Sequence, residues 1–118
     1  MPLTAEEWLT QVRETAQQYF PLAKLEAEVV RFTRVTVRVV IDEDRFADLF
    51  FREETGRIDY ALIVNSQRIF GLDNLDGWHE HPLSAPDDHV PCTEPTPAEA
   101  IRRLREASDN LIGQSNAS

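Results

Sequence analysis

The stretch "TRVTVRVVID" (residues 33–42) decides the fold class, because apolar residues recur in it at every second position. Successive side chains of a β-strand point to opposite faces of the sheet. One face of this strand would receive Val35, Val37, Val39 and Ile41. The opposite face would receive Arg34, Thr36, Arg38 and Val40. The alternation predicts a strand with one buried face and one more polar face.

The segments around this stretch extend the sheet. Strand-like composition recurs in "RFADLFFREE" (45–54), "RIDYALIV" (57–64) and "RIFGL" (68–72). Only "TG" at 55–56 and "NSQ" at 65–67 separate these segments, and connections this short join antiparallel neighbours. The stretch "LEAEVVRF" (25–32) is either a separate strand or the lead-in to residues 33–42. We therefore expect an antiparallel β-meander of four to five strands.

A helix is predicted on either side of this meander in the sequence. Residues 4–21 begin with Thr4 and Glu7 at the spacing of a capping box. Residues 96–113 begin in the same way and reach Gly113, a residue type that favours the end of a helix. These elements predict an α+β fold: an N-terminal helix, the β-meander, a long ordered loop and a C-terminal helix.

The bulk properties predict one cytoplasmic domain. The 118 residues suffice for a single domain over residues 1–118, with residues 113–118 expected to be a frayed tail. No apolar run approaches the roughly 20 residues that span a bilayer, and no secretory signal is visible, so we expect no membrane partner. The single cysteine cannot form an internal disulfide, and a free thiol fits a reducing compartment.

The net charge of −9 disfavours nucleic-acid binding unless the basic residues gather on one surface. Seven of the eleven arginines fall between residues 31 and 68. Residues 71–98 carry six acidic residues and neither lysine nor arginine. This segregation of charge leaves an arginine-bearing surface open, and it makes the segment after the last predicted strand acidic.

The segment over residues 71–97 holds the residues with chemical potential. It contains five of the seven prolines, all three histidines and the only cysteine: His79, His81, His89 and Cys92. A connection this long without regular structure is usually either functional or disordered. We predict an ordered loop, because proline stiffens it and Trp78 offers an apolar anchor.

A zinc site is one interpretation of this cluster. His79 and His81 can bind the same ion only if the backbone between them is extended, because residues i and i+2 then share a side. His89 and Cys92 would supply two further ligands, and zinc accepts both imidazole and thiolate. The spacing of the four residues matches no familiar zinc module, so we expect no resident metal and keep zinc as the alternative.

Acid–base catalysis is the second interpretation. Cleaving RNA without a metal needs one group that takes the 2′-hydroxyl proton and another that protonates the leaving oxygen. His79 and His81 could do both, with Asp73 and Asn74 holding the loop. An arginine would stabilise the charge that develops on phosphorus, and the candidates are Arg38, Arg52, Arg57 and Arg68.

A purely structural interpretation is also open. Asp73, Asn74 and Gly77 are turn-forming residues, and Trp78 could simply fill the core while the prolines route the chain to the last helix. In the same way, Tyr60 lies among the strand positions that face inward, where packing is the expected role. The acidity of the loop counts against phosphate binding.

The stretch "YALIVNSQRIFGLDNLDGWHEHP" (60–82) resembles the TumE-like toxin components of bacterial and archaeal toxin–antitoxin pairs. The similarity covers roughly residues 35–105, and its sharpest parts are Tyr60, the Asp73–Asn74 pair, and the histidines and prolines that follow. Two features depart from the family pattern. Gly71 stands where the family has arginine, and Glu80 separates two histidines that are usually adjacent.

The resemblance implies a small α+β toxin that is encoded beside a helix-turn-helix antitoxin and acts on RNA. The leading hypothesis is therefore a metal-independent ribonuclease with a cognate helix-turn-helix antitoxin as partner. It places catalysis on His79, His81, Asp73 and Asn74. It places substrate binding on Arg38, Arg52 and Arg68. The alternative is a non-catalytic protein-interaction module, able to form a homo-oligomer, with or without a structural zinc.

Overall fold

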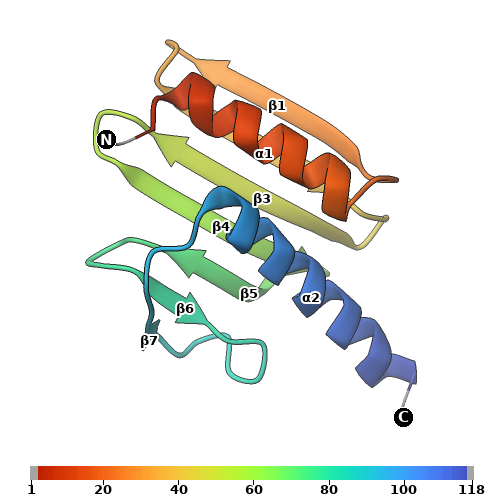
Figure 1. The fold of residues 1–118 in the computed structure, drawn as a ribbon. Coiled ribbons are helices and arrows are strands. Elements are labelled where there is room, and N and C mark those ends of the chain that lie inside the picture. Colours follow the sequence, from red (N-terminus) through yellow and green to blue (C-terminus); the bar gives the residue numbers. More distant parts are fainter. Residues whose placement is uncertain (1–2, 117–118) are drawn as a thin grey trace.

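The computed structural model describes residues 3–116, and side chains only over residues 3–111. It shows a seven-stranded antiparallel sheet in the order of the sequence, with one helix before it and one after it (Figure 1). The helices are α1 (Ala5–Tyr19) and α2 (Pro97–Asn116). The strands are β1 (Lys24–Val30), β2 (Arg34–Val40), β3 (Arg45–Arg52), β4 (Arg57–Val64), β5 (Gln67–Asp73), β6 (His79–His81) and β7 (Val90–Pro91). The predicted α+β class is confirmed.

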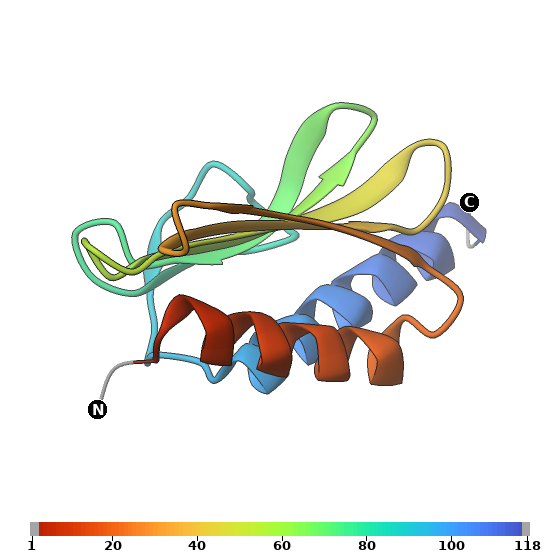
Figure 2. The same ribbon diagram turned by 90° about the horizontal axis from the view of Figure 1, so that it is seen from above.

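The fold has two layers, because both helices pack on one face of the sheet and leave the other face open (Figure 2). The alternation predicted for residues 33–42 holds, with Val35, Val37 and Val39 buried beneath the helices. The helices contribute fully buried side chains to the same core, chiefly Trp8, Val12, Ile101 and Leu104. None of the helices within the described residues is both long and apolar enough to cross a bilayer.

The strand count is higher than the four to five strands expected. The stretch 25–32 forms a separate strand, because Arg31 and Phe32 take positive φ and turn the chain, and the Thr33 N–H donates to the Val30 carbonyl. Two further strands lie inside the predicted loop. β6 and β7 are only three and two residues long, and β7 contains a proline, so they show no periodicity that a sequence pattern could reveal.

The helix ends match the predicted caps with one exception. At α1, Thr4 and Glu7 form the reciprocal capping box. At α2, the Thr96 hydroxyl accepts a hydrogen bond from the Glu99 N–H. Gly113 does not end α2, which continues to Asn116, because glycine weakens a helix without breaking its hydrogen bonds. Residues 117–118 of the expected tail lie outside the described residues.

The register of the strands sets out rows of side chains on the open face. Asp59, Asp73 and His79 are successive cross-strand partners, and so are Ala61, Gly71 and His81. Between β4 and β5 the pairing shifts by one residue, a β-bulge at Leu62/Ile63. A bulge re-aims the side chains beyond it. The open face therefore gathers the polar residues of β4, β5 and β6 in one place.

Candidate acid–base site on the open sheet face

His79 and His81 lie side by side on the open face, because β6 is extended and residues two apart share a side. Their ring centroids are 5.0 Å apart with the planes at 73°. The side chain of His79 is 13% exposed and that of His81 is 2% exposed, so only His79 reaches the surface. The geometric condition for a histidine pair is met.

Asp73 joins the two imidazoles. Its Oδ2 lies 3.0 Å from Nε2 of His81, and its Oδ1 lies 3.2 Å from Nε2 of His79. The same Oδ1 accepts a hydrogen bond of 3.0 Å from the Leu75 N–H, as an aspartate does at a turn. One buried carboxylate thus fixes both rings and the start of the following loop.

The carboxylate of Asp73 is held in its charged form. Burial by itself would raise its pKa, but the pKa is lowered overall by the Leu75 N–H, the hydrogen bond with His81 and the charges of both histidines. An ionised Asp73 can accept hydrogen bonds at both oxygens. It therefore supplies the fixed negative charge of the site.

The hydrogen bonds assign different protonation patterns to the two rings. Nδ1 of His79 lies 3.0 Å from the carbonyl oxygen of Gly77, while its Nε2 faces Asp73. Both nitrogens of His79 face an oxygen, so both contacts are favourable only when the ring carries two protons. With a proton on each nitrogen, the ring can act as a proton donor once a substrate oxygen takes the place of one of these acceptors.

His81 has the opposite arrangement. Its Nδ1 lies 3.3 Å from an Arg68 guanidinium nitrogen, which can only donate, so Nδ1 accepts. Its Nε2 then carries the proton that it donates to Asp73. The neutral ring satisfies both contacts, and neither nitrogen is free. His81 is built to hold Asp73 and Arg68 in place rather than to touch a substrate.

Arg68 reaches His81 because Gly71 carries no side chain. A Cβ on Gly71 would lie 3.1 Å from the Tyr60 carbonyl oxygen, 3.3 Å from Cδ of Arg68 and 3.6 Å from Cδ2 of His81. The bulge turns Arg68 to the open face as the partner of Ile63, and the arginine stem then crosses over Gly71. A guanidinium thus sits beside the histidines even though position 71 itself holds glycine.

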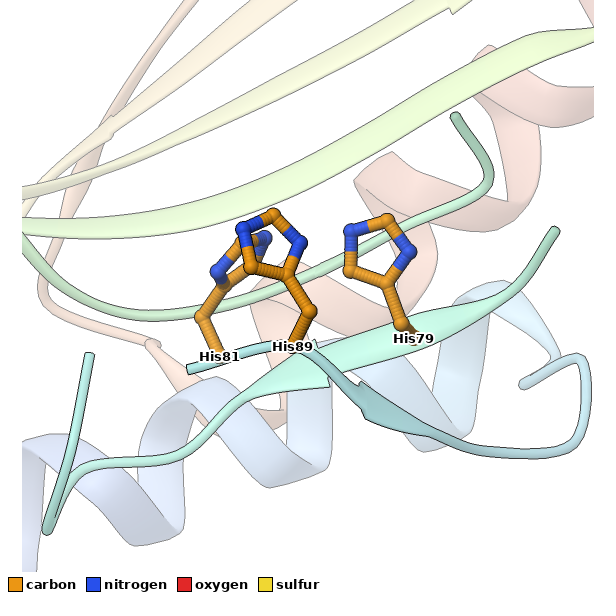
Figure 3. Close-up of side chains that lie close together, drawn as sticks. All are labelled: His79, His81 and His89. Atoms are coloured by element: carbon orange, nitrogen blue, oxygen red, sulfur yellow. The ribbon is translucent and has the colours of Figure 1, made fainter. Parts of the chain in front are cut away.

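His89 joins the cluster from the segment just before β7 (Figure 3). Its ring centroid lies 4.8 Å from that of His79 and 4.6 Å from that of His81, and the residue is exposed. One ring nitrogen of each histidine lies within 4.8 Å of the other two, so these three residues could hold a metal ion. Every histidine of the chain therefore converges on one spot.

Cys92, the fourth predicted metal ligand, is not part of this group. Pro91 is the cross-strand partner of His79 and therefore lies on the open face. Cys92 follows Pro91 directly, so its side chain points to the opposite, helix-covered side. There it packs against the core, and burial together with the charge of Glu80 raises the pKa of its thiol. The structure assigns Cys92 a packing position.

Asn74 and Trp78 have structural positions. Asn74 accepts a hydrogen bond from the Ile58 N–H at 2.9 Å and donates to the Gly56 carbonyl at 2.8 Å, which pins the end of β5 to the β3–β4 turn. Trp78 packs against the core and stacks on Tyr60, with centroids 6.4 Å apart. Tyr60 itself is fully buried and accepts a hydrogen bond from Trp8 Nε1. It lies on the face opposite the histidines.

The predicted arginines divide into one near the histidines and two farther away. Arg68 contacts His81 directly. Arg38 shares the row of His81 but stands on β2, four strands away, where it pairs with Asp48 through two hydrogen bonds. Arg52 lies at the end of β3 and pairs with Glu54. Only Arg68 is placed to act at the histidines.

Two further residues lie in this region: Asp59, which was not predicted to share the site, and Arg57, one of the candidate arginines. Asp59 is the direct cross-strand partner of Asp73, and burial and the Asp73 charge raise its pKa. Arg57 contacts Asp59 at 3.3 Å, and its Nε is buried without a partner among the described side chains. Their odd positions in "RIDYALIV" place them on the face opposite Tyr60, which is the only signal that the sequence offers.

Comparison of the chain with models of known protein families, with curated proteins and with solved structures gives no match.

Proposed function

We propose that this chain cleaves RNA by acid–base catalysis at the histidine cluster, as a toxin-like component of a toxin–antitoxin pair. One observation carries the proposal: His79 and His81 share the carboxylate of Asp73 on the open face of the sheet, and a guanidinium touches the second ring. A purely structural loop does not require two imidazoles, a buried carboxylate and an arginine at one point of an uncovered face.

The arrangement suggests a role for each group. His79, whose two nitrogens both face oxygens, is the proton donor, and Asp73 orients it. The side chain of His81 is only 2% exposed and cannot meet a substrate, so it supports Asp73 and Arg68. The exposed ring of His89, 4.8 Å from that of His79, is the proton acceptor. This assignment keeps His79 and Asp73 at the predicted centre, gives the predicted His81 a supporting role and adds His89 as the second accessible imidazole.

The reaction then balances without a metal. His89 takes the proton of the 2′-hydroxyl, and the 2′-oxygen forms a bond to phosphorus. The bond between phosphorus and the 5′-oxygen breaks, and His79 gives that oxygen its proton. The products are a 2′,3′-cyclic phosphate and a 5′-hydroxyl. Arg68 lies where it can offset the added negative charge on the phosphoryl oxygens.

The neighbouring surface suits a single-stranded substrate. Arg34, Arg52 and Arg57 are direct cross-strand partners at one end of the open face. Like charges placed opposite one another destabilise a sheet. Glu54 and Asp59 offset two of these three charges, and a bound phosphate would add a further negative charge beside them. Arg52 and Arg57 also line a cleft, together with Phe50 and Asn74. Phe50 offers a face on which a base can stack.

The toxin-like part of the proposal is supported by the resemblance over residues 35–105 together with this centre. A cognate helix-turn-helix antitoxin would be the partner. A variant of His79 tests the proposal, and a variant of Ser84, an exposed residue in the segment after β6, is the control. His79→Ala should lose about 10²–10⁴-fold in RNA cleavage and lose growth inhibition while it keeps its melting temperature. Ser84→Ala should cleave like the wild type.

His81 requires a separate expectation, because the residue is buried and bonded on both nitrogens. His81→Ala should lower the melting temperature as well as the cleavage rate. If folded His79→Ala protein cleaves RNA as fast as the wild type does, the proposed catalytic centre is wrong.

The alternative, a non-catalytic interaction module, is favoured by one other feature. β1 is an edge strand, and the apolar residues at and beside it are exposed, among them Leu22 at 99% and Phe32 at 89%. Open strand edges are templates for pairing with another chain. Light scattering would show an oligomer at micromolar concentration that Phe32→Ser disperses, and no variant of the histidines would affect any nuclease assay.

A further inference from the structure

We infer that His79, His81 and His89 form a binding site for a borderline transition-metal dication of the Zn²⁺ class. The site stands by itself, whether or not the chain cleaves RNA. It uses the three imidazoles that the fold brings together from β6 and from the segment before β7 (Figure 3).

The distances lie near those of a bound ion. Tetrahedral zinc holds imidazole nitrogens at about 2.0–2.1 Å, which places two such nitrogens about 3.4 Å apart. One nitrogen of each histidine already lies within 4.8 Å of the other two. Each pair of nitrogens would have to approach by at most about 1.4 Å, and the exposed His89 ring is freer to move than the two rings on β6. Water would supply the fourth ligand.

The surroundings of the rings resemble those of metal-bound histidines. A ligating histidine usually donates its other ring N–H to a carboxylate or a backbone carbonyl. The carbonyl of Gly77 accepts from Nδ1 of His79, so Nε2, which lies 3.2 Å from Oδ1 of Asp73, is the nitrogen that would bind the ion. Asp73 accepts from Nε2 of His81 in the same manner, so Nδ1 of His81 would bind the ion after the Arg68 guanidinium has moved away from it. Both rings are therefore oriented before an ion arrives.

The negative charge of the segment that carries the histidines, residues 71–98, favours the binding of a cation. Residues 71–98 carry six acidic residues and no lysine or arginine, and Asp87 and Asp88 directly precede His89. Imidazole ligands select zinc-like ions, because Mg²⁺ and Ca²⁺ prefer oxygen ligands. The one opposing charge is the guanidinium of Arg68, 3.3 Å from Nδ1 of His81. The same charge that serves phosphate binding should weaken metal binding.

A bound ion would also affect RNA cleavage, a consequence that rests on the proposed function. A ligating nitrogen has no lone pair left for proton transfer, so a bound ion would hold the acid–base centre inactive. Zinc would then act as an inhibitor of the cleavage reaction rather than as its cofactor. Binding itself is measured without RNA, so that failure of the ribonuclease proposal leaves the metal result intact.

The experiment is a titration of the untagged full chain with Co²⁺, followed by competition with Zn²⁺. The wild type should bind one ion and develop the visible absorption bands of a four-coordinate cobalt site. His89→Ala should bind at least about tenfold more weakly, because it removes a ligand from the exposed side. Arg68→Gln should bind more tightly than the wild type, because it removes the repelling charge. Cys92→Ala, the matched control, should bind like the wild type.

Three results would overturn the inference. One is the absence of binding at micromolar metal, and another is binding that is unchanged in His89→Ala. The third is binding lost in Cys92→Ala, which would place the ion elsewhere. Circular dichroism of each variant confirms that its fold is intact, and both His89 and Arg68 are exposed residues, so the two informative variants keep the core.

Discussion

Asp59 and Asp73 are direct cross-strand partners, so two carboxylates occupy neighbouring positions on the open face. The pair responds unequally to its surroundings. The pKa of Asp73 is lowered overall, although burial raises it, because the Leu75 N–H and both histidines stabilise its charge. The pKa of Asp59 is raised by burial and by the charge of Asp73, against the weaker influence of Arg57. The sheet thus stabilises the charged form of Asp73, and that charge disfavours the charged form of Asp59.

The first prediction concerns Asp59→Asn, which should be as stable as the wild type or more stable at pH 7. A raised pKa means that the charged form of Asp59 opposes folding, and the loss of its half-exposed pair with Arg57 costs about 0–1 kcal/mol at most. The folded chain holds the Asp59 proton to a higher pH than the unfolded chain does. The contribution of Asp59 to the unfolding free energy therefore falls as pH rises from 3.8, the ordinary pKa, through the raised value.

The variant lacks this group, so its advantage over the wild type should be absent below pH 3.8 and complete above the raised pKa of Asp59. Urea titrations of both proteins over that range measure the difference. A variant that is clearly less stable at pH 7 would show that the Arg57 pair outweighs the repulsion.

The second prediction concerns Asp73→Asn, which should lower the free energy of unfolding by about 2–3 kcal/mol. The residue is 3% exposed and accepts from a backbone N–H and from His81, and hydrogen bonds to a buried charge are the strong ones. Asp76→Asn is the matched control, because Asp76 is exposed in the next turn and asparagine tolerates its positive φ. Equal stability of the two variants at pH 7 would contradict the role given to Asp73.

The third prediction concerns Gly71→Ala, which should cost about 1–3 kcal/mol. The added Cβ would meet the Tyr60 carbonyl oxygen at 3.1 Å and Cδ of Arg68 at 3.3 Å, and only the arginine stem can give way. The variant should therefore also detach Arg68 from His81. Chemical denaturation measures the first effect, and a crystal structure of the variant shows the second. If Arg68 still contacts His81 in the variant, Gly71 is not needed for that contact.

The fourth prediction separates the two faces of the sheet. Tyr60→Phe should lose about 1–3 kcal/mol, because the buried Trp8 Nε1–H loses its acceptor at 3.1 Å. Cleavage by the folded variant should stay unchanged, because Tyr60 lies on the helix-covered side. Tyr19→Phe, at a half-buried site on the same side, is the stability control. A large loss of activity in folded Tyr60→Phe protein would assign Tyr60 a role in catalysis.

The main elements could be predicted because their patterns are long. The alternation of Val35, Val37 and Val39 with arginine and threonine identified β2 and its buried side, and the same parity placed Tyr60 in the core. The capping pair Thr4 and Glu7 identified the start of α1. β6 and β7 escaped prediction, because strands of three and two residues carry too few side chains to show a period.

The candidate site could be predicted only in part. His79 and His81 share a side because the backbone between them is extended, which the spacing required but could not establish. The approach of His89 depends on how the segment after β6 folds back, and no local pattern encodes that path. Arg68 reaches His81 through the bulge at Leu62/Ile63, which reverses the parity on which any assignment of its side would rest.

The central claim is that His79 and His89 transfer protons, with Asp73 orienting His79, in a cleavage that uses the 2′-hydroxyl of RNA. The most direct measurement compares an RNA oligonucleotide with its all-DNA counterpart, each incubated with purified untagged chain in the presence of a chelator. The RNA should be cut to fragments with 2′,3′-cyclic phosphate and 5′-hydroxyl ends, and the DNA should stay intact. Cleavage of the DNA, ends of another kind, or intact RNA would contradict the account.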